Sequence, residues 1–228
     1  MTPMIMNPFR FASTSSAGAD DYDSMYESRS DLTTIQKQHF VEWFSGSALD
    51  SIWNISNSNA GYTITMDDAV DGGMKLINNA VHTNSAILDF DGIRQYNQTS
   101  NEVISVFKSV PTSGGIMVGL GTSHINDSPY DSATMQIDAG YAGSAVQTLS
   151  SDGTSQTVTA TGFSADSNYH VYKLECTSTA LIPTIDGVIR TSKTTNRPAA
   201  TLMPVVKAYS YSGNTTQLNI TYYEVYNT

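Results

Sequence analysis

Near its C-terminal end the chain reads Tyr169-His170-Val171-Tyr172-Lys173-Leu174-Glu175-Cys176. In an extended segment Tyr172, Leu174 and Cys176 share one face, and Lys173 and Glu175 share the other. Such alternation predicts a half-buried β-strand. Two further apolar runs follow, at residues 181–185 and 188–191, and Asp186-Gly187 separates them. Because Asp-Gly supplies the positive φ angles of a two-residue turn, this stretch predicts a strand followed by a hairpin.

The same pattern of short strands and glycine turns extends back to about residue 40. The turn signals include Asp71-Gly72-Gly73, Asp91-Gly92, Ser113-Gly114-Gly115 and Asp152-Gly153. Many short strands with such turns are typical of sandwiches and barrels, and no long amphipathic helix is indicated. We therefore predict a single all-β domain over residues 35–228, a two-sheet antiparallel β-sandwich. Further strands are expected at residues 40–44, 52–55, 62–66, 74–77, 86–90, 93–96, 103–108, 116–120, 134–137, 146–149, 157–160, 204–208 and 218–226.

Some side chains can be assigned to the core or to the surface before the fold is known. Leu218, Ile220 and Tyr222 alternate with Asn219, Thr221 and Tyr223, so we expect the first three to face the core. Cys176 lies on the apolar face of its strand and is expected to be a buried thiol. As the one cysteine of the chain, it excludes an internal disulfide and a cysteine-based zinc site.

The composition excludes several classes of partner. Charged residues make up 14% of the chain, against about 25% in a typical domain. The net charge of -10 and the absence of a basic cluster argue against nucleic acid as a partner. The first residues lack the charged and apolar regions of a signal peptide. No apolar run approaches the roughly 20 residues of a membrane span.

Residues 1–34 differ from the rest and predict an extended N-terminal arm. A stretch of small residues precedes the acidic and aromatic stretch Asp20-Asp21-Tyr22-Asp23-Ser24-Met25-Tyr26. One interpretation is a disordered tail, and the other is an arm that orders on a neighbouring subunit. The second is favoured by apolar residues that a purely solvated tail rarely carries, among them Phe9, Phe11, Tyr22, Met25 and Tyr26.

Several motifs resemble the concanavalin A-like lectin/glucanase superfamily, which includes laminin G-like domains. Residues 169–175 are similar to its "W/Y-H-x-Y-x-hydrophobic-E" strand, Ile185-Asp186-Gly187 to the following hairpin, and residues 218–226 to its closing strand. Residues 40–53 look like its opening, "D-F-x-G-x-L-D-x-x-W". The resemblance spans residues 40–227 and implies a jelly roll. With its terminal Glu224-Val225-Tyr226-Asn227, the pattern also resembles non-catalytic jelly-roll proteins of tailed and environmental viruses.

The hydrolases of this superfamily place two carboxylates on one strand, in the pattern "E-x-D-x-x-E", as nucleophile and general acid. The glutamates of this chain are too far apart for that pattern, at positions 27, 42, 102, 175 and 224. The four histidines have no spacing typical of zinc ligands, and no G-x-S-x-G nucleophile motif is present. On these grounds we expect a protein that is not an enzyme and that needs no cofactor.

Two loops are candidates for ligand binding. Asp67, Asp68 and Asp71 precede a glycine turn and are a candidate calcium site, because calcium favours several oxygen ligands on a turning loop. The alternative is ordinary turn chemistry. Glycans require aromatic platforms with amides and carboxylates nearby, and the candidates for that site are Asn126, Asp127, Tyr130, Asp131 and Tyr141. Tyr209 and Tyr211 are further candidates, whereas Trp43 and Trp53 are expected to pack inside.

Two functions remain open from the sequence. The first is a structural protein of a virus particle, a capsid decoration or tail-associated subunit that assembles through the N-terminal arm. We would then expect a homo-oligomer located in the virion, assembled in the host cytoplasm and in contact with other virion proteins. The second is a lectin-like module that attaches to surface glycans. Fold analogy supports both, and fold alone does not determine function.

Overall fold

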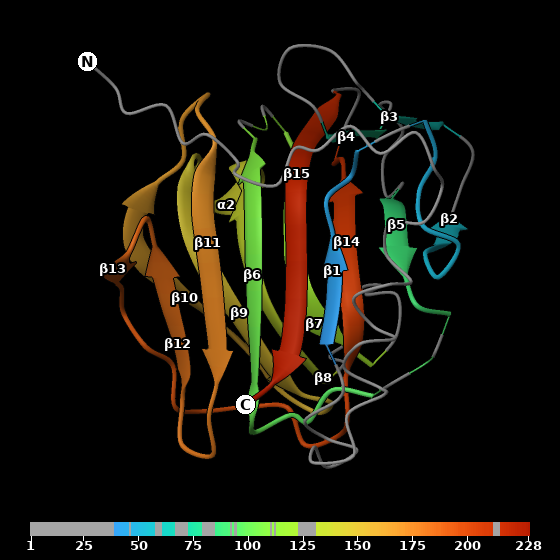
Figure 1. Cartoon of the computed structure of the whole chain (residues 1–228). Coiled ribbons are helices and arrows are strands. Elements are labelled where there is room, and N and C mark those ends of the chain that lie inside the picture. Colours follow the sequence, from blue (N-terminus) through green and yellow to red (C-terminus); the bar gives the residue numbers. More distant parts are fainter. Residues whose placement is uncertain are drawn as a thin grey trace.

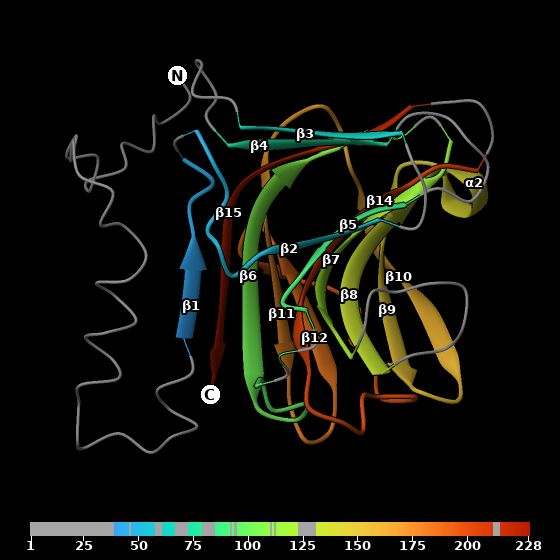
Figure 2. The same ribbon diagram turned by 90° about the vertical axis from the view of Figure 1, so that its right-hand side faces the viewer.

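The structure is a computed structural model, and it describes residues 39–45, 47–57, 61–66, 73–78, 85–91, 93, 95–109, 111, 113–122, 131–211 and 215–228. Two antiparallel sheets pack face to face, as Figures 1 and 2 show. The prediction of an all-β, two-sheet sandwich is confirmed. One short helix, α2 (Ala139–Ala142), connects two strands. No helix within the described ranges is long and apolar enough to cross a membrane.

The first sheet has eight strands. Its order is β13 (Val188–Ile189), β12 (Leu181–Ile185), β11 (His170–Cys176), β6 (Asn101–Lys108), β15 (Thr216–Asn227), β4 (Met74–Asn78) and β3 (Tyr62–Met66), and β1 (His39–Glu42) also pairs with β15. The second sheet has seven strands. Its order is β10 (Gln156–Ser164), β9 (Ala145–Asp152), β8 (Asp131–Asp138), β7 (Gly115–Gly121), β14 (Met203–Tyr209), β5 (Ser85–Asp89) and β2 (Asn54–Asn57).

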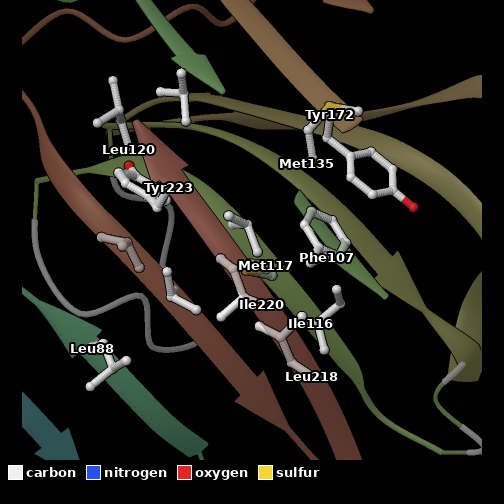
Figure 3. Close-up of a cluster of buried hydrophobic side chains, with 14 of the residues drawn as sticks. Leu88, Phe107, Ile116, Met117, Leu120, Met135, Tyr172, Leu218, Ile220 and Tyr223 are labelled. Atoms are coloured by element: carbon white, nitrogen blue, oxygen red, sulfur yellow. The ribbon is translucent and has the colours of Figure 1, made fainter. Parts of the chain in front are cut away.

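The core lies between the two sheets and is rich in aromatic rings (Figure 3). Phe107 of β6 and Tyr172 of β11 stack with their ring centroids 3.9 Å apart. The hydroxyl of Tyr223 donates a hydrogen bond of 2.8 Å to the backbone carbonyl of Gly119 in the opposite sheet. Cys176 is buried as expected, and burial raises the pKa of its thiol to about 12.

The last strand differs from the expected alternation at Thr221. A β-bulge lies between Ile220 and Tyr222, where the register of β15 against β6 shifts by one residue. Because one inserted residue reverses every later side chain, Tyr223 is fully buried and Tyr222 points to the outer surface. The expectation that Tyr222 faces the core is therefore wrong.

Trp43 does not pack inside either. It is 50% exposed, whereas Trp53 is buried. The next residue, Phe44, has φ of +44°, a left-handed conformation that is rare for a bulky residue. Glu42 supports this turn, since its carboxylate accepts hydrogen bonds from the Phe44 amide (2.8 Å) and from the Trp53 indole (3.3 Å). The turn buries Phe44 and leaves the Trp43 ring on the outer surface.

A strand was expected at residues 93–96 after an Asp91-Gly92 hairpin, and the described residues 93, 95 and 96 form none. Asp91 adopts the expected positive φ, +48°. β5 and the next strand, β6, lie in different sheets, and between them Tyr96 forms an isolated β-bridge with Leu202. The prediction of a turn at Asp91 was correct. The prediction that the residues after this turn pair with the strand before it was wrong.

One end of the sandwich is fastened by His170. Its ring nitrogens contact Asp186 of the β12–β13 turn (2.7 Å) and Asp166 of the segment after β10 (3.0 Å). The ring also packs edge-on against Phe163 of β10. Burial alone would lower the pKa of His170, but the hydrogen bonds to Asp186 and Asp166 outweigh burial and raise it. This cluster joins the edge of one sheet to the edge of the other.

We predict that His170→Gln destabilises the protein mainly at mildly acidic pH. Because the pKa of His170 is raised in the folded state, its stabilisation is complete below the unfolded pKa of about 6.5 and is lost as the pH rises through the folded pKa. The two carboxylates are partly exposed, so we expect an effect of about 1 kcal/mol or less. Urea unfolding at pH 5.5 and 8.5 measures it, and an equal difference from wild type at both values would contradict this role.

Candidate functional site

The seven-stranded sheet is curved, and its concave face points away from the other sheet (Figure 2). Strand register identifies the side chains on this face. Ile116 of β7 pairs with Ile137 of β8, and both are fully buried in the core. The neighbouring positions along each strand therefore face the concave side.

Strand β7 places almost no side chains on the concave face. Its positions there are Gly115, Met117, Gly119 and Gly121. A Cβ atom on Gly115 would lie 2.4 Å from the carbonyl oxygen of Ile137, and one on Gly119 would lie 2.4 Å from that of Ala133. Both positions therefore require glycine, and β7 forms a strip that carries no side chain of its own except Met117.

Polar side chains of β8 border this strip. Thr134 pairs with Gly119, and Gln136 pairs with Met117 on one side and Gln147 of β9 on the other. The Gln136 amide donates to the Gln147 side-chain oxygen (3.2 Å). The Thr134 hydroxyl and the Gln136 side-chain oxygen are buried and have no hydrogen-bond partner among the described residues. Such buried atoms are uncommon, and they mark places where a ligand or an ordered water donates.

Two tyrosines converge on Asp138 at one end of the strip. The hydroxyls of Tyr209 (2.8 Å) and Tyr211 (2.9 Å) both donate to Oδ2 of Asp138, and the Gly140 amide donates to Oδ1 (2.9 Å). Tyr209 and Asp138 pair with Gly115 from opposite sides. Because Gly115 has no side chain, the Tyr209 ring can lie across it to reach the carboxylate.

This tyrosine–aspartate cluster is a fixed set of hydrogen-bonding groups. Burial and the nearby Asp138 carboxylate raise the pKa of Tyr209, which keeps its hydroxyl protonated. The carboxylate accepts three hydrogen bonds, and each tyrosine oxygen keeps lone pairs that can accept from a ligand hydroxyl. Lys207 also lies on this face, with its amine 5.3 Å from the centroid of the Tyr209 ring.

The concave face is open toward β9 and β10. Gln147 and Tyr211 are half-buried, and the concave-facing side chains of β10 are exposed. They are Gln156, Val158 and Ala160, which pair with β9 in register. A ligand approaching from this side would first meet amide, hydroxyl and aromatic groups.

The sequence-predicted site residues lie mostly elsewhere. Asp67, Asp68 and Asp71 fall outside the described residues, as do Asn126, Asp127 and Tyr130 and the arm residues Phe9, Phe11, Tyr22, Met25 and Tyr26. Asp131 begins β8, and its carboxylate accepts hydrogen bonds from the amides of Ala199 (2.5 Å) and Ala200 (3.2 Å). The backbone of Tyr141 lies in α2. These sites stay predictions.

Sequence reasoning missed Thr134, Gln136 and Asp138. They alternate along one strand, and glycines alternate along the neighbouring strand at 115, 119 and 121. This double alternation is visible in the sequence. It could not be assigned to the concave face, because that requires the pairing of β7 with β8.

Comparison with known proteins identifies the architecture. No protein-family model matches the sequence, and no curated protein matches it. A lichenase from a mouse hindgut metagenome is similar in structure, with 14% identity over 83% of this chain and 99% of that one and a TM-score of 0.63. The Bacillus licheniformis β-glucanase is similar over 83% of this chain and 98% of its own, with 14% identity and a TM-score of 0.59. The fold is a concanavalin A-like jelly roll.

The same fold is found in the carbohydrate recognition domain of Emp46p in its potassium-bound form. The similarity covers 77% of this chain and 88% of that one, with 11% identity and a TM-score of 0.55. Within the described ranges of this jelly roll, no three His, Cys, Asp or Glu side chains are grouped as a metal site. The expected relation to concanavalin A-like proteins is confirmed at the level of the fold, and a viral origin stays a prediction.

The comparisons contradict the expectation that the jelly roll is not an enzyme, since β-glucanases are among the structures it resembles. That expectation rested on the spacing of glutamates along the sequence. Spacing is a poor guide here, because the sheet brings distant carboxylates to one face: Asp89 of β5 and Asp138 of β8 both face the concave side. The similarity itself establishes the fold and not an activity.

Proposed function

We propose that the concave face of the seven-stranded sheet binds carbohydrate. The observation that carries this proposal is the pair of unpartnered polar atoms on Thr134 and Gln136 beside the bare strip of β7. Saccharides present many hydroxyl groups that both donate and accept, and these atoms would accept from them. The similarity to glucanases and to a carbohydrate recognition domain supports the same class of ligand.

The chemistry of the face favours a saccharide over other small ligands. Its polar groups are mainly amides and hydroxyls, and Tyr211 offers a half-buried ring. Binding sites typically combine an apolar surface with a few fixed polar groups, and here Asp138 fixes the two tyrosines. A role in a virus particle rests on sequence patterns alone and is compatible with glycan binding.

A glycan-array screen, run with calcium and with chelator, identifies the saccharide. The strongest hit is then titrated by calorimetry against wild type, Thr134→Val and Gln136→Met. Each variant removes about one hydrogen bond of 0.5–1.5 kcal/mol, which weakens binding roughly 2- to 13-fold. A reducing-sugar assay on the same saccharide measures whether it is also cleaved.

Thr184→Val is the matched control, because Thr184 lies on β12 in the other sheet. It should bind as wild type does. A blank array under both conditions would contradict the proposal, and so would affinities that Thr134→Val and Gln136→Met leave unchanged.

A further inference from the structure

The outer face of the eight-stranded sheet carries a continuous row of apolar side chains. Tyr222 of β15 pairs with Val106 of β6, which pairs with Val171 of β11. The Trp43 ring extends the row, with its centroid 4.5 Å from that of Tyr222. Trp43 is 50% and Val171 41% exposed. The solvent face of an antiparallel sheet is usually polar, so this row is a candidate contact surface.

Lysines and glutamates lie beside the row on the same face. Asn219 pairs with Lys75 on one side and with Lys108 on the other, one step along the strands from Tyr222. Lys108 lies over the Tyr169 ring (4.4 Å), and Lys173 pairs with Glu102 (2.6 Å). In a chain of net charge -10, three of the six lysines therefore gather on this face. Glu175 and Glu224 also face this side, and the Tyr222 hydroxyl donates to Glu224 (2.5 Å), so the positive charge is concentrated at Lys75 and Lys108.

We propose that residues 20–27 of the same chain bind this outer face. The segment reads Asp20-Asp21-Tyr22-Asp23-Ser24-Met25-Tyr26-Glu27. Its four carboxylates complement Lys75 and Lys108. Its three large apolar side chains complement the row of Trp43, Tyr222, Val106 and Val171. An apolar contact gives this pairing its strength, and charge complementarity favours it over other partners.

The position of β1 favours a contact within one chain. β1 begins at His39, whose ring meets Tyr226 of the outer face edge-on, so residues 1–38 join the domain on that face. The eleven residues from 28 to 38 can span up to about 36–40 Å, whereas His39 and Trp43 are about 13 Å apart along a strand. A tether that short gives an effective concentration in the millimolar range, which favours the chain's own segment over a neighbour's.

Contact quenching by Trp43 tests the proposal in the full chain. Ser24→Cys is labelled with a dye that tryptophan quenches on contact. The native Cys176 is buried, and burial raises the pKa of its thiol to about 12, so the label goes to position 24. If about half of the molecules are docked, fluorescence is roughly twofold lower than in the same labelled protein carrying Trp43→Phe. Trp53 is in the core and out of reach of the dye.

Charge variants separate specific docking from chance contact. Lys75→Glu with Lys108→Glu should restore the fluorescence, and adding Asp21→Lys with Asp23→Lys should lower it again. Thermal unfolding confirms that each variant is folded. Equal fluorescence with and without Trp43 would overturn the proposal. Quenching that grows stronger as the protein concentration is raised roughly a hundredfold would also overturn the proposal, because such quenching would assign the contact to a neighbouring subunit.

Discussion

Asp138→Ala is expected to lower the free energy of unfolding by about 3 kcal/mol or more and to abolish saccharide binding. The carboxylate accepts hydrogen bonds from Tyr209, Tyr211 and the Gly140 amide, and the alanine variant leaves these donors without an acceptor. Each buried group left unpaired costs about 1–3 kcal/mol. Urea denaturation measures the stability, and calorimetry with the array hit measures the binding.

Asp138→Asn is the matched control. It keeps the shape of the side chain and one acceptor oxygen, so we expect a loss of about 1 kcal/mol. Tyr211→Phe removes one donor at the half-buried end of the cluster and should cost no more than that. An alanine variant as stable as wild type would show that the two tyrosines do not depend on Asp138, and the cluster would lose its proposed role.

Tyr223→Ala is expected to destabilise the protein by about 3–5 kcal/mol, whereas Tyr222→Ala should cost less than about 1 kcal/mol. Tyr223 is fully buried and its hydroxyl donates to the carbonyl of Gly119, while Tyr222 lies on the outer face. The two residues are adjacent and chemically identical, so the difference reports the bulge at Thr221 alone. Urea denaturation of both variants measures it. Equal losses would contradict the register of β15.

Much of the fold could be predicted because apolar and polar side chains alternate regularly along its strands. The strands at 170–176 and 181–185 have the predicted bounds, β13 is two residues shorter than predicted, and most other strands differ by one to three residues at their ends. Asp186 and Gly187 have φ of +50° and +79°, as the turn requires. The motifs of the opening and closing strands correctly indicated a concanavalin A-like jelly roll.

The errors have local physical causes that alternation does not reveal. A single inserted residue at Thr221 exchanges the faces of Tyr222 and Tyr223. A left-handed Phe44 turns Trp43 outward. Neither Thr221 nor Phe44 is a glycine, the residue that usually signals a bulge or a left-handed turn in a sequence.

Tyr209 and Tyr211 were named as candidates from the sequence, but the rest of the candidate site was beyond sequence reasoning for a different reason. It consists of residues from β7, β8 and β14 that meet only through strand register. Gly115 matters because Tyr209 and Asp138 are its two cross-strand partners. No local motif contains all three residues, so their meeting becomes visible only in the folded sheet.

Methionine methyl NMR tests the central claim, that the concave face binds carbohydrate, most directly. All four of these methionines are buried: Met117 and Met203 face the concave side, and Met74 and Met135 face the space between the sheets. On titration with the strongest array hit, we expect the Met117 methyl resonance to shift in a saturable manner and those of Met74 and Met135 to stay in place. A saccharide that binds to saturation and leaves Met117 unchanged would place the site elsewhere and contradict the account.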